Sequence, residues 1–208
     1  MSEYPLSQIM AINRFRMGTD GKGISTLVAF YGCNLSCKYC LNPQCKDEKT
    51  RRTNIKPEHL VDILAVDDIY FKSTGGGVVF GGGEPLIQSK YISEVCKLMP
   101  KEWQKRIETS LNAPWNKIEI LIPYINQWII DIKDSNLNIY KEYAGGDSLF
   151  VYENVEKLSS IVGKDKLLIR IPQIPDYNTD TDIIMSMELY SGFGTIDLVN
   201  YRKLNISI

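Results

Sequence analysis

The chain has 208 residues, of which 44% are hydrophobic and 24% charged, and its formal net charge is −1. This composition is that of an ordinary folded protein and excludes a disordered or collagen-like chain. The near-equal numbers of basic and acidic residues, 24 and 25, provide no electrostatic basis for binding nucleic acid. No apolar run approaches the roughly 20 residues of a membrane-spanning helix, and the N-terminus lacks the apolar stretch of a signal peptide. We therefore expect a cytoplasmic protein with neither nucleic-acid nor membrane partners.

Short apolar runs alternate along the chain with longer segments of helical pattern. An N-terminal strand or extended segment with a glycine turn is expected over residues 1–24. Further strands are predicted over residues 25–31, 77–80, 105–109, 127–132, 166–171 and 195–199. Helices are predicted over residues 57–70, 89–99, 114–124, 135–163 with a break at Gly145–Gly146, and 179–190.

This alternation predicts βα units whose parallel strands are joined by right-handed crossovers. Six such units fit into the chain, whereas a closed eight-unit barrel needs about 250 residues. The predicted fold is therefore an α/β structure, an incomplete (βα)6 barrel with a parallel sheet that is open on one side. Since the sequence shows no internal repeat and no linker rich in proline and serine, we expect a single domain over residues 1–208.

Three of the five cysteines, Cys33, Cys37 and Cys40, lie within eight residues directly after a predicted strand. Three thiolates on one tight loop can bind three irons of a [4Fe–4S] cluster and leave the fourth iron open for another ligand. The alternative is a structural zinc ion, with Cys45 or His59 as the fourth ligand. Zinc sites usually combine two distant pairs of ligands, and the sequence has no second pair of cysteines at such spacing. The spacing therefore favours the cluster.

A glycine-rich turn, Gly81-Gly82-Gly83-Glu84-Pro85, follows the strand predicted over residues 77–80. Glycine allows the backbone to approach a ligand closely or to adopt a positive φ, and an acidic residue follows at once. A plain turn at the end of a strand is the alternative interpretation. Because the turn lies at the C-terminal end of its strand, where the active sites of barrels lie, its position favours ligand binding.

Polar residues also close the later strands. Glu108 and Thr109 end one strand, Asp131 and Lys133 follow the next on one face, and Arg170 lies within another. Polar groups in buried strands are costly unless they are paired or used. A structural ion pair explains each of them singly, but their convergence on one rim predicts an active site.

Taken together, these motifs resemble those of the radical S-adenosylmethionine (SAM) superfamily. The sequences CNLSCKYC and GGGEP carry this resemblance. The runs DGKGI, GGGEPL, ETS, DIK and RIPQIPDYN further resemble the activating enzymes of glycyl radical enzymes, and the similarity covers residues 15–205, nearly the whole chain.

The resemblance implies that SAM binds the open iron of a [4Fe–4S] cluster. One electron from an external donor such as flavodoxin or ferredoxin then cleaves SAM into methionine and a 5′-deoxyadenosyl radical, which abstracts hydrogen. The implied activity is the generation of a glycyl radical on a partner enzyme, a polypeptide substrate. The alternatives are a radical SAM enzyme that directly epimerises or cross-links a peptide or small molecule and, outside this class, a non-catalytic binding module stabilised by zinc.

The resemblance also implies roles for individual residues in holding the cofactor. Gly82, Gly83 and Glu84 would hold the methionine amino group of SAM. The backbone at Tyr39 would meet the adenine.

Further implied roles fall on the ends of the later strands. Asp131 and Lys133 would act at the methionine end of SAM, beside a monovalent-cation site where Glu108 and Thr109 also fall. Arg170 would be a cofactor-side residue, and we count Lys133 and Arg170 among the candidate catalytic residues.

The sequence departs from the activating-enzyme pattern in several places. Lys22 replaces a proline and Ser25 an arginine of that pattern, and Arg202 holds the position of a histidine. Arg202 is expected either to bind a carboxylate of the cofactor or substrate, or to be a solvated side chain. Only Cys45 and Cys96 remain outside the first motif, so a second four-iron cluster cannot be built.

Overall fold

The computed structural model describes residues 7–200. They belong to two compact units, of which the first comprises residues 7–33, 44–109 and 113–129, and the second residues 34–43, 110–112 and 130–200. Within the described part of the chain, no helix has the length and apolar character needed to cross a membrane.

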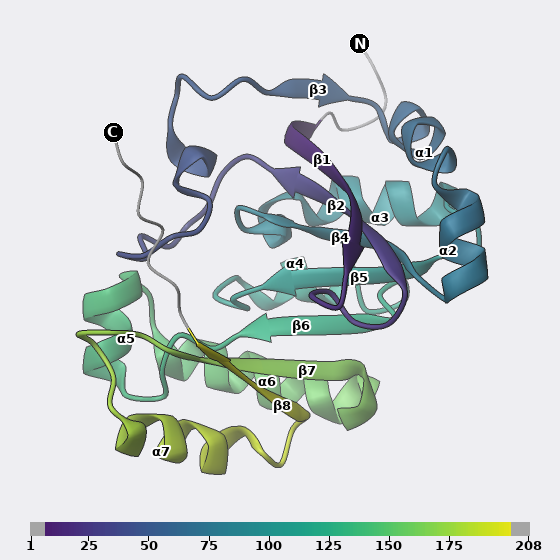
Figure 1. Cartoon of the computed structure of the whole chain (residues 1–208). Helices are drawn as coiled ribbons and strands as arrows, with labels where there is room; N and C mark the ends of the chain where they lie inside the picture. The colour runs from purple at the N-terminus through teal and green to yellow at the C-terminus, as the bar shows by residue number, and fades with distance from the viewer. Residues whose placement is uncertain (1–6, 201–208) are drawn as a thin grey trace. The chain divides into compact units, whose positions relative to one another are not determined.

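The first unit is built on a mixed sheet with the strand order β3-β1-β2-β4-β5 (Figure 1). Strands β2, β4 and β5 are parallel, whereas β1 is antiparallel to both β2 and β3. The strands span Ser7–Met17 (β1), Ile24–Phe30 (β2), Thr53–Ile55 (β3), Gly77–Gly82 (β4) and Gln104–Thr109 (β5).

Strand β1 is irregular towards its C-terminal end. Its pairing with β2 shifts register between Asn13 and Arg16, and Phe15 between them has a φ of 58°, a value that side chains other than glycine rarely adopt. On the other side of β1, strand β3 pairs only with Ser7–Ile9. These features mark a bulge in a strand with a short partner at its edge.

Aromatic side chains join the sheet of the first unit to its helices. Phe30 of β2 packs against Phe80 of β4 and Tyr91 of helix α3, with ring centroids 6.2 Å apart in both pairs, and Phe71 of α2 packs on Trp103 at 5.1 Å. All five side chains are buried, which makes this contact the core of the unit. The helices span Pro57–Ala65 (α1), Asp68–Thr74 (α2), Ser89–Leu98 (α3) and Trp115–Glu119 (α4), with short 3-10 helices at Pro43–Lys46 (η1) and Pro85–Gln88 (η2).

The second unit contains the parallel strands β7 and β8, together with the end of β6. The amide of Ile132, just after β6, donates a hydrogen bond to the carbonyl of Arg170 in β7 (3.0 Å), and helix α7 packs against β7 (Figure 1). The strands span Gln127–Asp131 (β6), Leu167–Gln173 (β7) and Thr195–Asn200 (β8), and the helices Leu137–Ala144 (α5), Ser148–Val162 (α6) and Asp180–Tyr190 (α7), with a 3-10 turn at Lys164–Lys166 (η3).

Local capping explains why the helices of the second unit begin where they do. The side chains of Asn136 and Asp147 accept hydrogen bonds from backbone amides of α5 and α6. At α7, Thr179 and Asp182 form a reciprocal capping box. Each cap satisfies an amide that the first helical turn leaves without a partner.

The six strands predicted after residue 24 coincide with β2, β4, β5, β6, β7 and β8, and the break at Gly145–Gly146 separates α5 from α6 as expected. In the expected N-terminal segment, Ser7–Met17 form the strand β1, and residues 1–6 lie outside the described part of the chain. β1 and β3 add two antiparallel strands to the predicted parallel ones. Strand β3, with three residues, was not predicted because it is too short to show an alternating pattern.

Two helix predictions were wrong in their extent. The helix predicted over residues 57–70 is two helices, α1 and α2, because the chain turns at Val66–Asp67, where Asp67 is bound by side chains of the sheet. The helix predicted over residues 114–124 ends at Glu119, since Pro123 cannot supply the amide that a longer helix requires.

Candidate functional site

In the first unit, the glycine-rich turn after β4 is bound directly to the chain segment that leads to Cys33. The amide of Gly83 donates to the carbonyl of Phe30 (3.0 Å), and the amide of Glu84 donates to the carbonyl of Gly32 (2.8 Å). Gly32 in turn donates to the carbonyl of Cys45 (2.8 Å). The backbone of this turn therefore lies against the residue that precedes the first cysteine of the motif.

The turn needs glycine for two different reasons. Gly82 has a φ of +94°, which favours glycine, and a Cβ at Gly83 would lie 2.1 Å from the carbonyl oxygen of Gly32. Side chains at these positions would push the two backbone segments apart. The plain turn considered from the sequence is therefore insufficient, because these residues are required for close backbone approach.

Glu84 is a buried carboxylate with defined hydrogen-bond donors. Its side chain is 2% exposed, and its Oε1 accepts hydrogen bonds from the hydroxyl of Thr109 (2.6 Å) and the amide of Leu86 (3.1 Å). Glu108, one residue before Thr109, extends its Oε2 to within 3.2 Å of where a Cβ of Gly81 would stand. A buried carboxylate fixed by neutral donors suits a cationic ligand group such as an ammonium.

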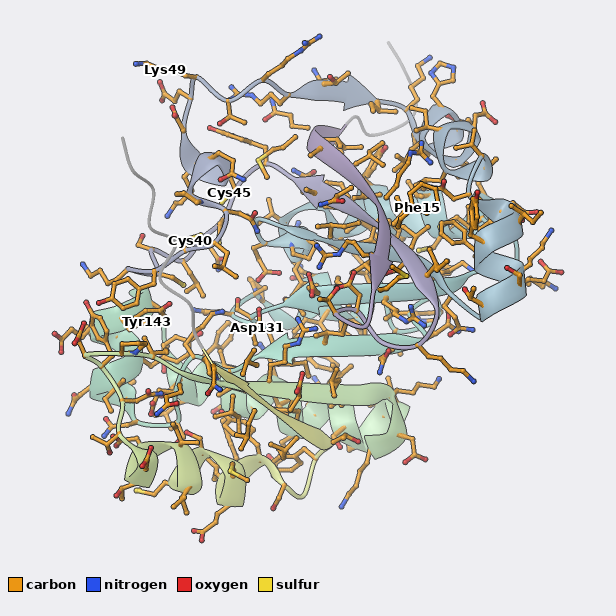
Figure 2. The ribbon with its side chains drawn as sticks, in the orientation of Figure 1. Phe15, Cys40, Cys45, Lys49, Asp131 and Tyr143 are labelled. Atoms are coloured by element: carbon orange, nitrogen blue, oxygen red, sulfur yellow. The ribbon has the colours of Figure 1, made fainter. Side chains whose placement is uncertain are left out.

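In the second unit, the segment of residues 34–43 carries Cys37 and Cys40 and adopts no regular structure up to Pro43. The amides of Ser36 and Lys38 donate to the carbonyls of Ala144 (2.7 Å) and Tyr143 (3.0 Å) at the C-terminal end of α5. Carbonyls at a helix end lack partners within the helix, so they are available to fix this segment. Figure 2 labels Cys40 on the segment and Tyr143 on the helix beside it.

Tyr39 lies in a cluster of three tyrosines with Tyr143 and Tyr177. The ring centroids are 6.2 Å apart for Tyr39–Tyr143, 5.7 Å for Tyr39–Tyr177 and 5.1 Å for Tyr143–Tyr177. The hydroxyl of Tyr39 donates to Oδ2 of Asp176 (2.9 Å). Sequence reasoning missed these contacts, because no spacing in the sequence links residue 39 to residues 143, 176 or 177.

The polar residues predicted at the ends of β6 and in β7 form ion pairs. Lys133 Nζ lies 3.6 Å from Asp131 Oδ2, so the two share one side of the chain as expected. Arg170 Nε lies 3.5 Å from Asp197 Oδ2 of β8. Asp197 was not singled out from the sequence, although the register of β7 and β8 places it opposite Arg170.

Asp134 follows Lys133 and is 1% exposed. Burial raises the pKa of this carboxyl group, and hydrogen bonds from Asn136 and Asn178 oppose the rise. Asp134 accepts from the backbone amide of Asn136 (2.8 Å) and from the side-chain amide of Asn178 (3.2 Å). It therefore ties the chain after β6 to the loop after β7.

The three cysteines of the motif lie on the irregular segment that follows β2. All three are half-buried and outside disulfide bonds, and within residues 7–200 no three His, Cys, Asp or Glu side chains lie close enough to hold one ion. In a [4Fe–4S] cluster each thiolate binds a different iron, so the sulfurs need not converge on one point. Nothing within residues 7–200 supports the monovalent-cation site expected near Asp131.

The remaining zinc candidates, and the last cysteine, differ in burial. Cys45 is 1% exposed within η1, and His59 is exposed on α1. Cys96 is buried in α3, as predicted, and burial raises the pKa of its thiol to about 12. A thiol with this pKa remains protonated and is a poor metal ligand.

The predicted site residues fall into two sets. The first unit holds Cys33, Gly82, Gly83, Glu84, Glu108 and Thr109, and the second holds Cys37, Tyr39, Cys40, Asp131, Lys133 and Arg170. Contacts within each set are described above, and the convergence of both sets on one rim remains a prediction. Arg202 lies outside the described residues.

Comparisons with known proteins place this site in context. A family model described as the radical SAM superfamily matches residues 27–188. The chain is 26% identical to the (2S)-3-sulfopropanediol dehydratase activating enzyme of Klebsiella oxytoca, over 98% of this chain and 84% of the relative. It is 27% identical to the 4-hydroxyphenylacetate decarboxylase activating enzyme of Clostridioides difficile, over 90% of this chain and 80% of the relative. The chain is 31% identical to the pyruvate formate-lyase-activating enzyme of Clostridium pasteurianum, but the match covers only 61% of this chain and 52% of the relative.

Solved structures show the same fold at low sequence identity. QueE from Escherichia coli matches 94% of this chain and 95% of its own, with a TM-score of 0.51 and 15% identity. SuiB from Streptococcus suis, solved with S-adenosylmethionine, matches 85% of this chain and 40% of its own, with a TM-score of 0.66 and 18% identity. The fold is thus an α/β partial barrel with a mixed, mostly parallel sheet.

Proposed function

Because the chain belongs to the radical SAM superfamily, we propose that it uses its [4Fe–4S] cluster and SAM to generate a glycyl radical on a partner enzyme. The observation that carries this proposal is the similarity to activating enzymes of glycyl radical enzymes over nearly the whole chain. When bound, the cluster and SAM supply the one-electron chemistry that removes a hydrogen atom. The chain itself, taken as one radical SAM domain of 208 residues, has to bind, orient and enclose these groups.

Cys33, Cys37 and Cys40 are proposed to bind three irons through their thiolates. This leaves one iron open, as in catalytic metal sites that keep a position for the substrate. The Tyr39 backbone, between the last two of these cysteines, is proposed to contact the adenine of SAM.

Glu84 is proposed to bind the amino group of the methionine part of SAM, with the backbone of Gly82 and Gly83 beside it. Support comes from the burial of the Glu84 carboxylate and from the close backbone approach at Gly83. Thr109 orients the Glu84 carboxylate through its 2.6 Å hydrogen bond. A fixed, buried carboxylate forms a stronger charge-assisted bond to an ammonium than a solvated one does.

Lys133 is proposed to bind the carboxylate of SAM, and Arg170 to lie beside the cofactor. Each is already close to a carboxylate, Asp131 or Asp197, which holds its side chain in place. Glu108 is assigned to the same cofactor-side group of residues. That Arg202 binds a carboxylate of the cofactor or substrate stays a prediction.

The test uses a candidate glycyl radical enzyme whose glycine carries deuterium on its α-carbon. The reconstituted chain, SAM and a reductant such as reduced flavodoxin are mixed with it without oxygen. We expect a glycyl radical signal in electron paramagnetic resonance (EPR) and deuterium in the 5′-deoxyadenosine produced. A Cys37→Ala variant should give neither.

Two results would contradict the proposal. If candidate partners acquire no radical while an added peptide is epimerised or cross-linked, direct modification of the substrate is the function. If the wild-type chain never forms deoxyadenosine despite a full complement of iron, the chain is not a radical SAM catalyst.

A further inference from the structure

We propose that Asp176 is a positioning residue that holds the cysteine-bearing loop, residues 34–40, through the hydroxyl of Tyr39. We call residues 174–178, which follow β7, the clamp, because they hold the cysteine-bearing loop in position. This inference concerns the cluster and holds whichever substrate the enzyme acts on.

Asp176 supplies the clamp with a carboxylate at a left-handed backbone position. Its φ is +69°, a conformation that glycine adopts freely and that aspartate tolerates better than most other residues. The residue is exposed, so no burial of apolar surface favours it. What the aspartate supplies instead is a carboxylate oxygen 2.9 Å from the Tyr39 hydroxyl.

The ring of Tyr39 is held from two further sides. Its edge-to-face contacts with Tyr143 of α5 and Tyr177 of the clamp fix the plane of the ring. Tyr143 is 1% exposed and packs on Tyr177 as well. The hydrogen bond to Asp176 therefore acts on a side chain with little freedom left, so it fixes the position of residue 39 rather than a mobile ring.

The clamp is itself anchored at its base. The side chain of Asn178 accepts from the amide of Ile174 (2.6 Å) and donates to the carbonyl of Pro172 (2.9 Å). It also donates to the buried carboxyl of Asp134 (3.2 Å). These three bonds tie the loop of residues 174–178 to its own base and to the chain after β6, so the clamp offers Tyr39 an anchored partner.

Tyr39 lies between Cys37 and Cys40, so fixing it pre-orders both thiols before the cluster binds. Backbone bonds to α5 fix the loop at Ser36 and Lys38, and the Asp176 bond adds a third attachment near Cys40. Pre-ordering lowers the entropy cost of binding and slows dissociation. The clamp should therefore lengthen the lifetime of the cluster.

The test compares Asp176→Gly, Asp176→Asn and Tyr39→Phe in the reconstituted protein. Asp176→Gly removes the carboxylate at a backbone position that glycine adopts freely, so the cluster-free protein should unfold at nearly the wild-type temperature. Iron release to a chelator should nevertheless be about two- to tenfold faster, the effect of one net hydrogen bond. A structural role alone cannot produce this split. Asp176→Asn keeps an acceptor oxygen and should release iron nearly as slowly as the wild type.

Tyr39→Phe should release iron as fast as Asp176→Gly, and the double variant no faster than either, because both remove one bond. The EPR spectrum of the reduced cluster should change together with the rate. Glu142→Ala, which removes an exposed carboxylate from α5, is the matched control and should behave as the wild type. The proposal would be overturned if Asp176→Gly released iron at the wild-type rate, or if the two substitutions had additive effects on that rate in the double variant.

Discussion

Gly83 shows how a single residue fixes the spacing of a site. Its missing side chain allows the turn after β4 to hydrogen-bond to the backbone of Phe30 and Gly32, which lead to the first cysteine. The carbonyl that a side chain would meet belongs to backbone and cannot rotate away. A substitution at Gly83 therefore tests whether glycine is required there for the close approach of the two backbone segments or only for forming the turn.

We expect Gly83→Ala to destabilise the protein by about 2–4 kcal/mol, since a Cβ would force two backbone segments apart. It should also weaken SAM binding. The control is Gly192→Ala, because an added Cβ there meets no atom within 4 Å, and its effect should stay within about 0.5 kcal/mol. Thermal unfolding and calorimetric titration with SAM provide the measurements; equal stability of the two variants would refute the steric explanation.

The buried carboxylate of Asp20 makes the stability of the protein depend on pH. Burial alone would raise the pKa of its carboxyl group, but hydrogen bonds from Arg16, Thr19 and Ser25 and the charge of Arg16 outweigh it and lower the pKa. Arg16 Nη2 donates a hydrogen bond to the Asp20 carboxylate (2.6 Å), and the Ser25 hydroxyl donates a second one to the same carboxylate (3.1 Å). The ionised form therefore stabilises the fold above the unfolded pKa of about 3.9 and loses this contribution as the pH falls through the lower, folded pKa.

Asp20→Asn should cost about 2 kcal/mol of unfolding free energy at pH 7, where the wild-type carboxylate is charged and bonded. The difference from the wild type should shrink as the pH falls below about 4. Urea unfolding of both proteins at pH 7 and pH 3 measures this. A difference that is constant over this range would show that charge plays no part.

At the scale of elements, the start of α2 depends on a contact with the sheet. Asp67 precedes the helix and makes no capping bond with its own side chain. Instead its carboxylate accepts hydrogen bonds from Thr26 of β2 (2.8 Å) and from Arg14 of β1. The side chain is thus used to join the helix to two strands, at the point where α1 and α2 separate.

Asp67→Ala is expected to lower the free energy of unfolding by about 2–3 kcal/mol, because it leaves the buried Thr26 hydroxyl and the Arg14 guanidinium without this acceptor. Asp62→Ala, which removes an exposed carboxylate from α1, should change it by less than about 0.5 kcal/mol. Chemical denaturation of the two variants distinguishes the outcomes. Equal effects would mean that the contact adds no stability.

The elements that could be predicted from the sequence are those with a local signal. Buried strands such as β4 are short apolar runs, and α7 begins at a capping box that is readable in the chain. The break between α1 and α2 was missed because it arises from bonds between Asp67 and distant strands. Within the site, the cysteine and glycine motifs could be identified because their residues are adjacent, whereas the Tyr39–Asp176 bond joins residues 137 positions apart.

At the scale of the whole molecule, the cysteines divide by environment. Cys33, Cys37 and Cys40 are half-buried on irregular segments, whereas Cys45 and Cys96 are buried within the first unit. Two buried thiols cannot supply the four ligands of a second [4Fe–4S] cluster. The chain therefore has the ligands for one cluster.

Reconstituted wild-type protein should contain about four iron atoms per chain. Cys33→Ala, Cys37→Ala and Cys40→Ala should each lose most of this iron and the accompanying visible absorbance, because each removes a ligand. Cys45→Ala and Cys96→Ala should retain it, with losses confined to stability. If Cys45→Ala loses iron as fully as Cys37→Ala, the assignment of three ligands and one open iron is wrong.

The bulge at Phe15 has a consequence for how copies of this protein behave at high concentration. An exposed, regular strand edge offers unpaired amides and carbonyls to strands of other molecules and so promotes aggregation. Here β3 pairs with the first residues of β1, and the shifted register with Arg14 and Arg16 interrupts the rest. A strand from a second copy would therefore find few regularly spaced partners along this edge, which disfavours edge-to-edge association.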